Sequence, residues 1–153
     1  MPTERADRPA QTAVRQDAPP SAGVVIAVSL AAEPSLVPDV RHSLRAVVLM
    51  WGSLELADQL ELLASELVSN AVRHGGGDDV TVLLKVQGGS ALLEVTDHSG
   101  TEPIPRSAGA DDEGGRGLAL VGLLADVWGW YPAPRGRKTV WAGLALSKAG
   151  DAA

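Results

Sequence analysis

Glu66 and Asn70 are the two residues of this chain whose chemistry and spacing are most informative. They stand four positions apart in an amphipathic stretch, so a helix would place the carboxylate and the amide on one face. Further along the chain, Asp97 follows an apolar run, and the glycine-rich segment 114–121 comes after it. A carboxylate at a strand end can hold a base, and glycines that open a helix can hold phosphates. This order of residues predicts an ATP site.

The amide of Asn70 is a candidate ligand for Mg²⁺. This metal keeps most of its waters and takes one or two protein oxygens together with substrate phosphates. Glu66, one helical turn earlier, is then a candidate general base for a hydroxyl or water near the metal. His74 continues the same line of the helix. A solvated polar face is the alternative for these three residues, because charged and amide side chains are common on helix surfaces.

Asp97 is a candidate adenine-binding residue because it follows the apolar "ALLEV", where a strand leaves the sheet. An ionised carboxylate accepts a hydrogen bond from the exocyclic amine of adenine, whereas guanine has an oxygen at that position. The alternative is an Asp that caps a turn through its own backbone. The glycines of segment 114–117 begin a predicted helix, where free N–H groups favour phosphate. Tight packing is the alternative explanation for those glycines.

The composition limits the classes of protein to which this chain belongs. Its 153 residues are 45% hydrophobic, which predicts one domain with a sizeable core. The absence of Cys excludes disulfides and thiolate metal sites, and three scattered His form no zinc pattern. A net charge of −6 with dispersed Lys and Arg argues against a direct nucleic-acid partner. The chain shows no signal peptide and no membrane-spanning run, so we expect a cytoplasmic protein.

Periodicity and turn residues predict a disordered tail over 1–22, an ATP-binding domain over 23–147 and a C-terminal tail over 148–153. The expected strands cover 23–30, 80–86, 91–96, 127–131 and 139–146. The expected helices run from 34–38 to 51, from 58 to 74 and from 118 to 125. Hairpins with segregated helices predict a two-layer α/β sandwich, in which a mixed, mostly antiparallel sheet carries helices on one face. The intervening loop over 98–113, roughly sixteen residues long, is expected to be functional.

Four segments, in order, carry a resemblance to a known family: "ELVSNAVRHG", "LLEVTDHSG", "DDEGGRGLALV" and "GRKTVW". They resemble the Bergerat-type, histidine kinase-like ATPases of gyrase, mismatch-repair proteins and sensor histidine kinases. Within that group the chain is most similar to the anti-sigma-factor serine kinases of bacteria, over about residues 23–146. One departure is that Ser99 and Gly100 occur where the superfamily has D-x-G-x-G, as in many small anti-sigma-like members.

The resemblance implies the Bergerat ATP-binding fold, with ATP and Mg²⁺ bound. It implies that Glu66 is the general base, that Asn70 binds Mg²⁺, that Asp97 reads adenine and that Thr139 helps hold the adenine end. Glycines at the third motif would line the phosphates under a mobile lid. The complete set of expected nucleotide-binding residues is Asn70, Arg73, His74, Asp97, Gly114, Gly115, Arg116, Gly117, Leu118 and Thr139.

The resemblance further implies a protein serine kinase that binds a sigma factor and phosphorylates the antagonist of that factor, and it makes a homodimer one expectation. A nucleotide-dependent protein-binding regulator without kinase activity is the alternative, and an ATPase domain serving another signalling protein is a third. The segment "RHSLRA" imitates the phosphoacceptor box of sensor histidine kinases but lacks its Pro. We therefore expect His42 to be a surface position on the first helix.

Overall fold

The computed structural model describes residues 22–100 and 113–146. Residues 1–21 of the expected N-terminal tail, the expected C-terminal tail and residues 101–112 of the expected loop over 98–113 lie outside the described residues. The elements are, in chain order, β1 (Gly23–Ala31), a 3-10 turn (Pro34–Leu36), α1 (Val37–Leu49), α2 (Leu54–His74), β2 (Asp79–Gln87), β3 (Ser90–Asp97), α3 (Glu113–Leu124), β4 (Val127–Ala133), a second 3-10 turn (Pro134–Gly136) and β5 (Arg137–Ala145).

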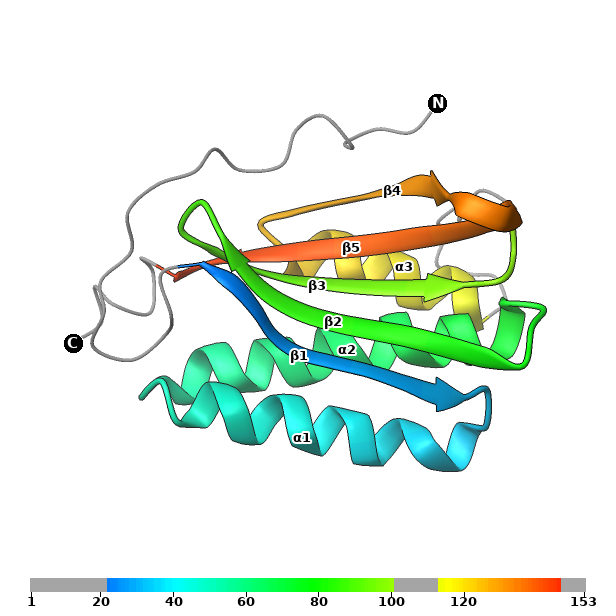
Figure 1. Ribbon diagram of the computed structural model, residues 1–153. Coiled ribbons are helices and arrows are strands. Elements are labelled where there is room, and N and C mark those ends of the chain that lie inside the picture. Colours follow the sequence, from blue (N-terminus) through cyan, green and yellow to red (C-terminus); the bar gives the residue numbers. More distant parts are fainter. Residues whose placement is uncertain (1–21, 101–112, 147–153) are drawn as a thin grey trace.

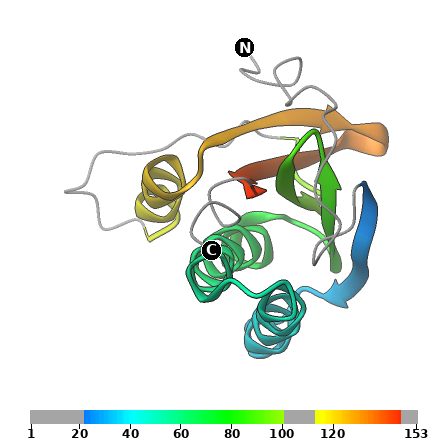
Figure 2. The same ribbon diagram turned by 90° about the vertical axis from the view of Figure 1, so that its left-hand side faces the viewer.

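The strands form one five-stranded sheet in the order β1-β2-β3-β5-β4, and each neighbouring pair is antiparallel. Helices α1, α2 and α3 lie together on one face of this sheet (Figures 1 and 2). The expected two-layer α/β sandwich is therefore confirmed. Strand β1 is one edge of the sheet, and its register shifts between Val24 and Ile26.

The inner face of the sheet follows from strict alternation of apolar residues along the strands. In β2, Val80, Val82, Leu84 and Val86 are buried while the residues between them are half-exposed. This period of two places every second side chain against the helices. Strand β3, in the middle of the sheet, is buried along nearly its whole length. Gly88 and Gly89 both have positive φ, as a tight hairpin turn between β2 and β3 requires.

Helix α2 is the central helix of the helical layer and carries the apolar stripe that the sequence predicts. Leu60, Leu63 and Leu67 are buried against the sheet side, at helical spacing. The helix begins at Leu54, four residues before the expected start at Asp58. The reason is an N-cap: the backbone N–H of Leu56 donates to Ser53 Oγ at 3.0 Å.

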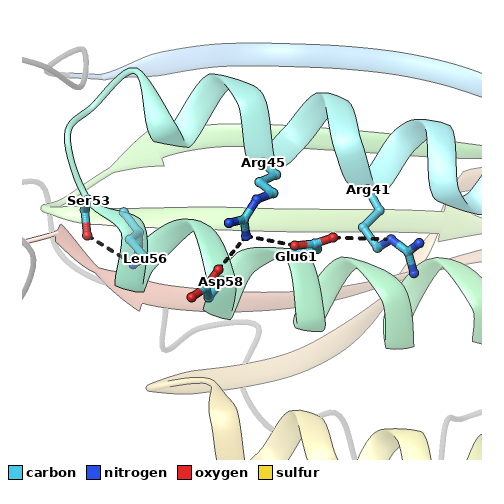
Figure 3. Close-up of polar contacts among 6 residues, drawn as sticks. All are labelled: Arg41, Arg45, Ser53, Leu56, Asp58 and Glu61. Atoms are coloured by element: carbon cyan, nitrogen blue, oxygen red, sulfur yellow. Dashed lines mark hydrogen bonds and ion pairs between the residues drawn. The ribbon is translucent and has the colours of Figure 1, made fainter.

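Polar contacts join α1 to one side of α2 (Figure 3). Arg45 donates to Asp58 at 2.5 Å and to Glu61 at 2.9 Å, and Arg41 Nε lies 3.5 Å from Glu61 Oε2. The hydrogen bond with Asp58 raises the pKa of Arg45 above its ordinary value. Such partly exposed pairs contribute little stability individually. They nevertheless define the side of α2 that faces α1, whereas His42 is exposed on α1 as expected.

Helix α3 packs against α2 and begins at Glu113, five residues before the expected start at Leu118. The glycine-rich segment therefore lies inside the first turns of the helix instead of before them. Near the other end of α3, a Cβ built on Gly122 would lie 3.5 Å from the indole nitrogen of Trp128 in β4. Among the helices of the described ranges, none has the length and apolar character needed to cross a membrane.

The cap of α2 gives a test of the fold. Ser53→Ala removes the acceptor for the Leu56 N–H, so we expect the free energy of unfolding to fall by about 1 kcal/mol. Urea denaturation followed by circular dichroism measures this change. Ser43→Ala is the matched control, since Ser43 is exposed within α1 and Ala is the better helix former there. Equal losses in the two variants would show that the cap contributes nothing specific.

Candidate nucleotide-binding site

Helix α2 lies between α1 and α3, and this arrangement sets the direction of its polar residues (Figure 2). Glu61 faces α1, because both arginines of α1 contact it. At about 100° per residue, Glu66 is rotated by about 140° and Asn70 by about 180° from Glu61 around the helix axis. Both residues are half-buried. Glu66 and Asn70 therefore lie on the side of α2 that is turned away from α1 and toward α3.

Asp97 is the last residue of β3 and lies on the inner face of the sheet, since it continues the alternation of Leu93 and Val95. The C-terminal end of α2 approaches it closely. A Cβ built on Gly75 would lie 2.7 Å from Asp97 Cβ and would also overlap the carbonyl oxygen of Ala71. Glycine at position 75 thus allows the helix end and the strand end to meet at one place.

This contact fixes the order of the candidate residues along α2. Asp97 lies beside Gly75, at the C-terminal end of α2. At a rise of 1.5 Å per residue, Asn70 lies roughly 7.5 Å and Glu66 roughly 13.5 Å from Gly75 along the helix axis, toward the N-terminus of α2. A nucleotide presents its base, its phosphates and its reacting γ-phosphate in the same order. The site therefore offers the carboxylate of Asp97, then the amide of Asn70, then the carboxylate of Glu66, in that order.

Asp97 is paired with Lys138 in the interior of the protein. Lys138 Nζ donates to Asp97 Oδ1 at 3.2 Å and to Oδ2 at 3.1 Å, and the two residues are only 4% and 3% exposed. The backbone N–H of Ser99 also donates to Oδ1, at 2.8 Å. The turn-capping role considered as an alternative for Asp97 is therefore present, together with a buried ion pair.

Thr139 lies beside Thr96 on β3. In the register of β3 and β5, Asp97 pairs with Lys138 and Thr96 pairs with Thr139. The hydroxyls of the two threonines are 2.6 Å apart. Because successive residues of a strand point to opposite faces, Thr139 is on the outer face of the sheet and is not brought to Asp97. Lys138 occupies the position beside Asp97, although no motif of the sequence pointed to a role for this lysine.

His98 follows Asp97 and extends the polar end of the sheet. Its Nε2 lies 2.6 Å from Asp79 Oδ1, and Ser29 Oγ donates to the other oxygen of Asp79 at 3.3 Å. The hydrogen bond from His98 holds the pKa of the Asp79 carboxyl below its ordinary value. A Cβ on Gly77 would overlap the His98 ring, so this glycine also permits a close approach.

The remaining expected residues lie at two helix ends. Arg73 and His74 are exposed in the last turn of α2. Gly114, Gly115, Arg116, Gly117 and Leu118 lie in the first turns of α3, and their side-chain environment falls outside the described part of the structure. The first turn of a helix leaves N–H groups without intrahelical partners, as phosphate binding requires.

The donor set fits a magnesium ion that is held mainly by phosphates and water. Asn70 provides a half-buried amide oxygen on the α3 side of α2. Over residues 22–100 and 119–146, whose side chains the structure describes, no group of three or more His, Asp or Glu side chains is arranged to hold a metal ion. One amide oxygen with substrate phosphates is a usual environment for Mg²⁺.

The sequence matches the family described as "Histidine kinase-like ATPase domain" over residues 30–142. The chain belongs to this family. A crystal structure of the RsbU and RsbW domains of Rv1364c from Mycobacterium tuberculosis is similar, with a TM-score of 0.58 and 20% sequence identity. The similarity covers 79% of this chain and 32% of that chain, so the present chain spans about a third of the length of the one it matches. This similarity concerns the fold alone. No curated protein matches the sequence.

The contact between Gly75 and Asp97 gives a test of the site. Gly75→Ala introduces a methyl group that has no room, so we expect unfolding free energy to fall by about 1–3 kcal/mol. ATP affinity should fall as well, because Asp97 must move. Gly122→Ala is the matched control: its Cβ meets only an ordinary contact at 3.5 Å, and Ala favours the helix. Calorimetric unfolding and ATP titration measure both effects. A Gly75→Ala variant with the stability and ATP affinity of wild type would contradict the close contact between Gly75 and Asp97.

Proposed function

We propose that this histidine kinase-like ATPase is a protein serine kinase that binds a sigma factor and phosphorylates the antagonist of that factor, in the cytoplasm. The observation that carries the proposal is the order of Asp97, Asn70 and Glu66: Asp97 ends β3 beside the C-terminal end of α2, and Asn70 and then Glu66 follow along that helix. It provides a place for the base, for the metal and for the reacting end of one extended nucleotide. The family match supports ATP binding, and the resemblance of the motifs to anti-sigma-factor serine kinases supports the choice of substrate.

Glu66 would act as the general base. Its carboxylate accepts the proton of a serine hydroxyl while the serine oxygen attacks the γ-phosphorus of ATP. The bond between that phosphorus and the bridging oxygen breaks, so the products are phosphoserine and ADP. Phosphoryl transfer depends mainly on positioning and charge stabilisation. Half-burial of Glu66 on the α3 side of α2 would keep the carboxylate beside the nucleotide.

Asn70 would hold Mg²⁺ through its amide oxygen. When bound, the metal neutralises charge on the phosphate oxygens. The first turn of α3, with Gly114, Gly115 and Gly117, would present N–H groups to the same phosphates. Gly75 and Asp97 would hold the adenine end. Asn70 and Gly75 belong to α2 and its C-terminal cap, the phosphate-binding glycines to α3, and Asp97 to the end of β3. Nucleotide binding would therefore join the helical layer to the sheet.

A binding module without phosphate transfer is the second function to be separated by experiment. In that case nucleotide occupancy would only change the surface that the chain presents to a protein partner. The buried Asp97 favours nucleotide binding under both proposals, whereas Glu66 has a chemical role only in the kinase. Nucleotide binding and phosphate transfer can therefore be tested separately.

ATP binding should stabilise the folded protein. At a hundredfold excess over its dissociation constant, ATP with Mg²⁺ should raise the free energy of unfolding by about 2.7 kcal/mol. GTP should have a much smaller effect, because guanine offers no amine at position 6. Asp97→Asn should lose most of the shift, and Asp39→Asn, at an exposed site on α1, should retain it. Thermal unfolding measures these shifts, and a melting temperature unaffected by ATP and Mg²⁺ would rule out the nucleotide site.

Loss of Glu66 should separate transfer from binding. Glu66→Ala should lower phosphate transfer to a serine of the antagonist by roughly 10² to 10⁴, the usual contribution of a general base. The ATP-induced melting shift and capture of the sigma factor should persist, because the carboxylate does not contact adenine. Glu55→Ala, an exposed position in the first turn of α2, is the matched control. Transfer is followed with labelled ATP and candidate antagonist proteins.

Two results would change the assignment. Wild-type protein that binds ATP but transfers no phosphate to any antagonist would favour the binding module. A Glu66→Ala variant as active as wild type would show that another residue is the base.

A further inference from the structure

Lys138 is a buried cation with an unusual position. It lies opposite Asp97 on the inner face of the sheet, at the end where α2 and β3 meet. Its Nζ directs two hydrogen bonds to the Asp97 carboxylate. An ammonium group has three N–H donors. Within the described residues Nζ has no acceptor other than Asp97, so one donor remains available.

The Asp97 carboxylate has an unused acceptor position, as the Lys138 ammonium has an unused donor. Its two oxygens offer about four acceptor positions. Lys138 uses two of them and the backbone N–H of Ser99 uses one. One acceptor position therefore remains beside one donor position. Taking two charges out of water is costly even when they are paired, and a ligand that uses both remaining positions would complete their hydrogen bonding.

The Watson–Crick edge of adenine has the matching pattern, with a donor at N6 and an acceptor at N1 next to it. We propose that Lys138 is a specificity-determining residue that donates to N1 of adenine while Asp97 accepts from N6. This inference rests on the ATP binding proposed above and adds a direct contact from the protein to a second atom of the base.

The pair would reject other purines for a physical reason. Guanine and hypoxanthine present an acceptor at position 6 and a donor at position 1, which is the reverse order. In the orientation that adenine takes, their O6 would face the Asp97 carboxylate and their N1–H would face the Lys138 ammonium. A buried polar group without a partner costs more than the hydrogen bond itself contributes.

An analogue of ATP tests the contact without any change in the protein. In 1-deaza-ATP a C–H group replaces N1, while N6 and the phosphates are kept. Wild-type protein should bind 1-deaza-ATP about ten- to a hundredfold more weakly than ATP, since a hydrogen bond from a charged group is lost. 7-deaza-ATP, altered on the opposite edge of the purine, should bind like ATP. Isothermal titration calorimetry with Mg²⁺ present measures all three affinities.

Variants then assign the effect to Lys138. Lys138→Met keeps a long side chain without a donor, so it should bind ATP and 1-deaza-ATP with equal affinity. Lys138→Gln keeps a donor and should retain part of the preference for ATP. Lys85→Met is the matched control. Lys85 also pairs with a buried carboxylate, Glu94, at 2.9 Å, but both residues lie on the outer face of the sheet.

The possible outcomes are distinct. Tighter binding of ATP than of 1-deaza-ATP that is lost in Lys138→Met and kept in Lys85→Met supports the proposal. Equal binding of ATP and 1-deaza-ATP by wild type overturns it and leaves Lys138 as a structural partner of Asp97, with the proposed function intact. If Lys138→Met still binds ATP more tightly than 1-deaza-ATP, the proposed contact between Lys138 and N1 is also overturned. No binding of ATP by wild type would contradict the proposed function and this inference together.

Discussion

The packing of α2 on the inner face of the sheet is the constraint on which the candidate site depends. Leu60, Leu63 and Leu67 are almost completely buried, and each such side chain contributes about 1.5–3 kcal/mol relative to an exposed one. Their stripe fixes the rotation of the helix about its own axis. Any other rotation would expose leucines, so Glu66 and Asn70 are held beside the core on the α3 side. The apolar residues therefore position the polar ones.

A second constraint concerns charge. Asp97 lies in the interior because β3 ends beside the C-terminal end of α2. The absence of a side chain at Gly75 lets the helix end and the strand end pack directly against each other. A carboxylate buried there without a cation would be strongly destabilising. Lys138 provides that cation from the neighbouring strand, through direct cross-strand pairing. Asp97 and Lys138 thus lie in the interior of the protein, where a low local dielectric strengthens the interaction between their charges.

The sequence predicted the layers and most elements because their signals are local. Alternation in β2 and the leucine spacing of α2 each depend only on nearby residues. The start of α2 was placed late because Ser53, its cap, precedes the periodic leucines. The pairing of Lys138 with Asp97 was not predicted, for a different reason. The face of each strand residue depends on its register with the next strand, and a difference of one residue exchanges Thr139 for Lys138. Motif spacing alone contains no information on that register.

The contact between α3 and Trp128 has an optical consequence. The indole of Trp128 lies on β4, at the edge of the sheet, and Gly122 of α3 comes close to its nitrogen. Indole emission depends on the polarity around the ring. Since α3 begins with the glycines proposed to contact phosphate, a displacement of this helix would change the surroundings of Trp128. The chain therefore contains its own fluorophore at the boundary between α3 and the sheet, and a displacement of the helix would change the contribution of Trp128 to the combined emission of the four tryptophans.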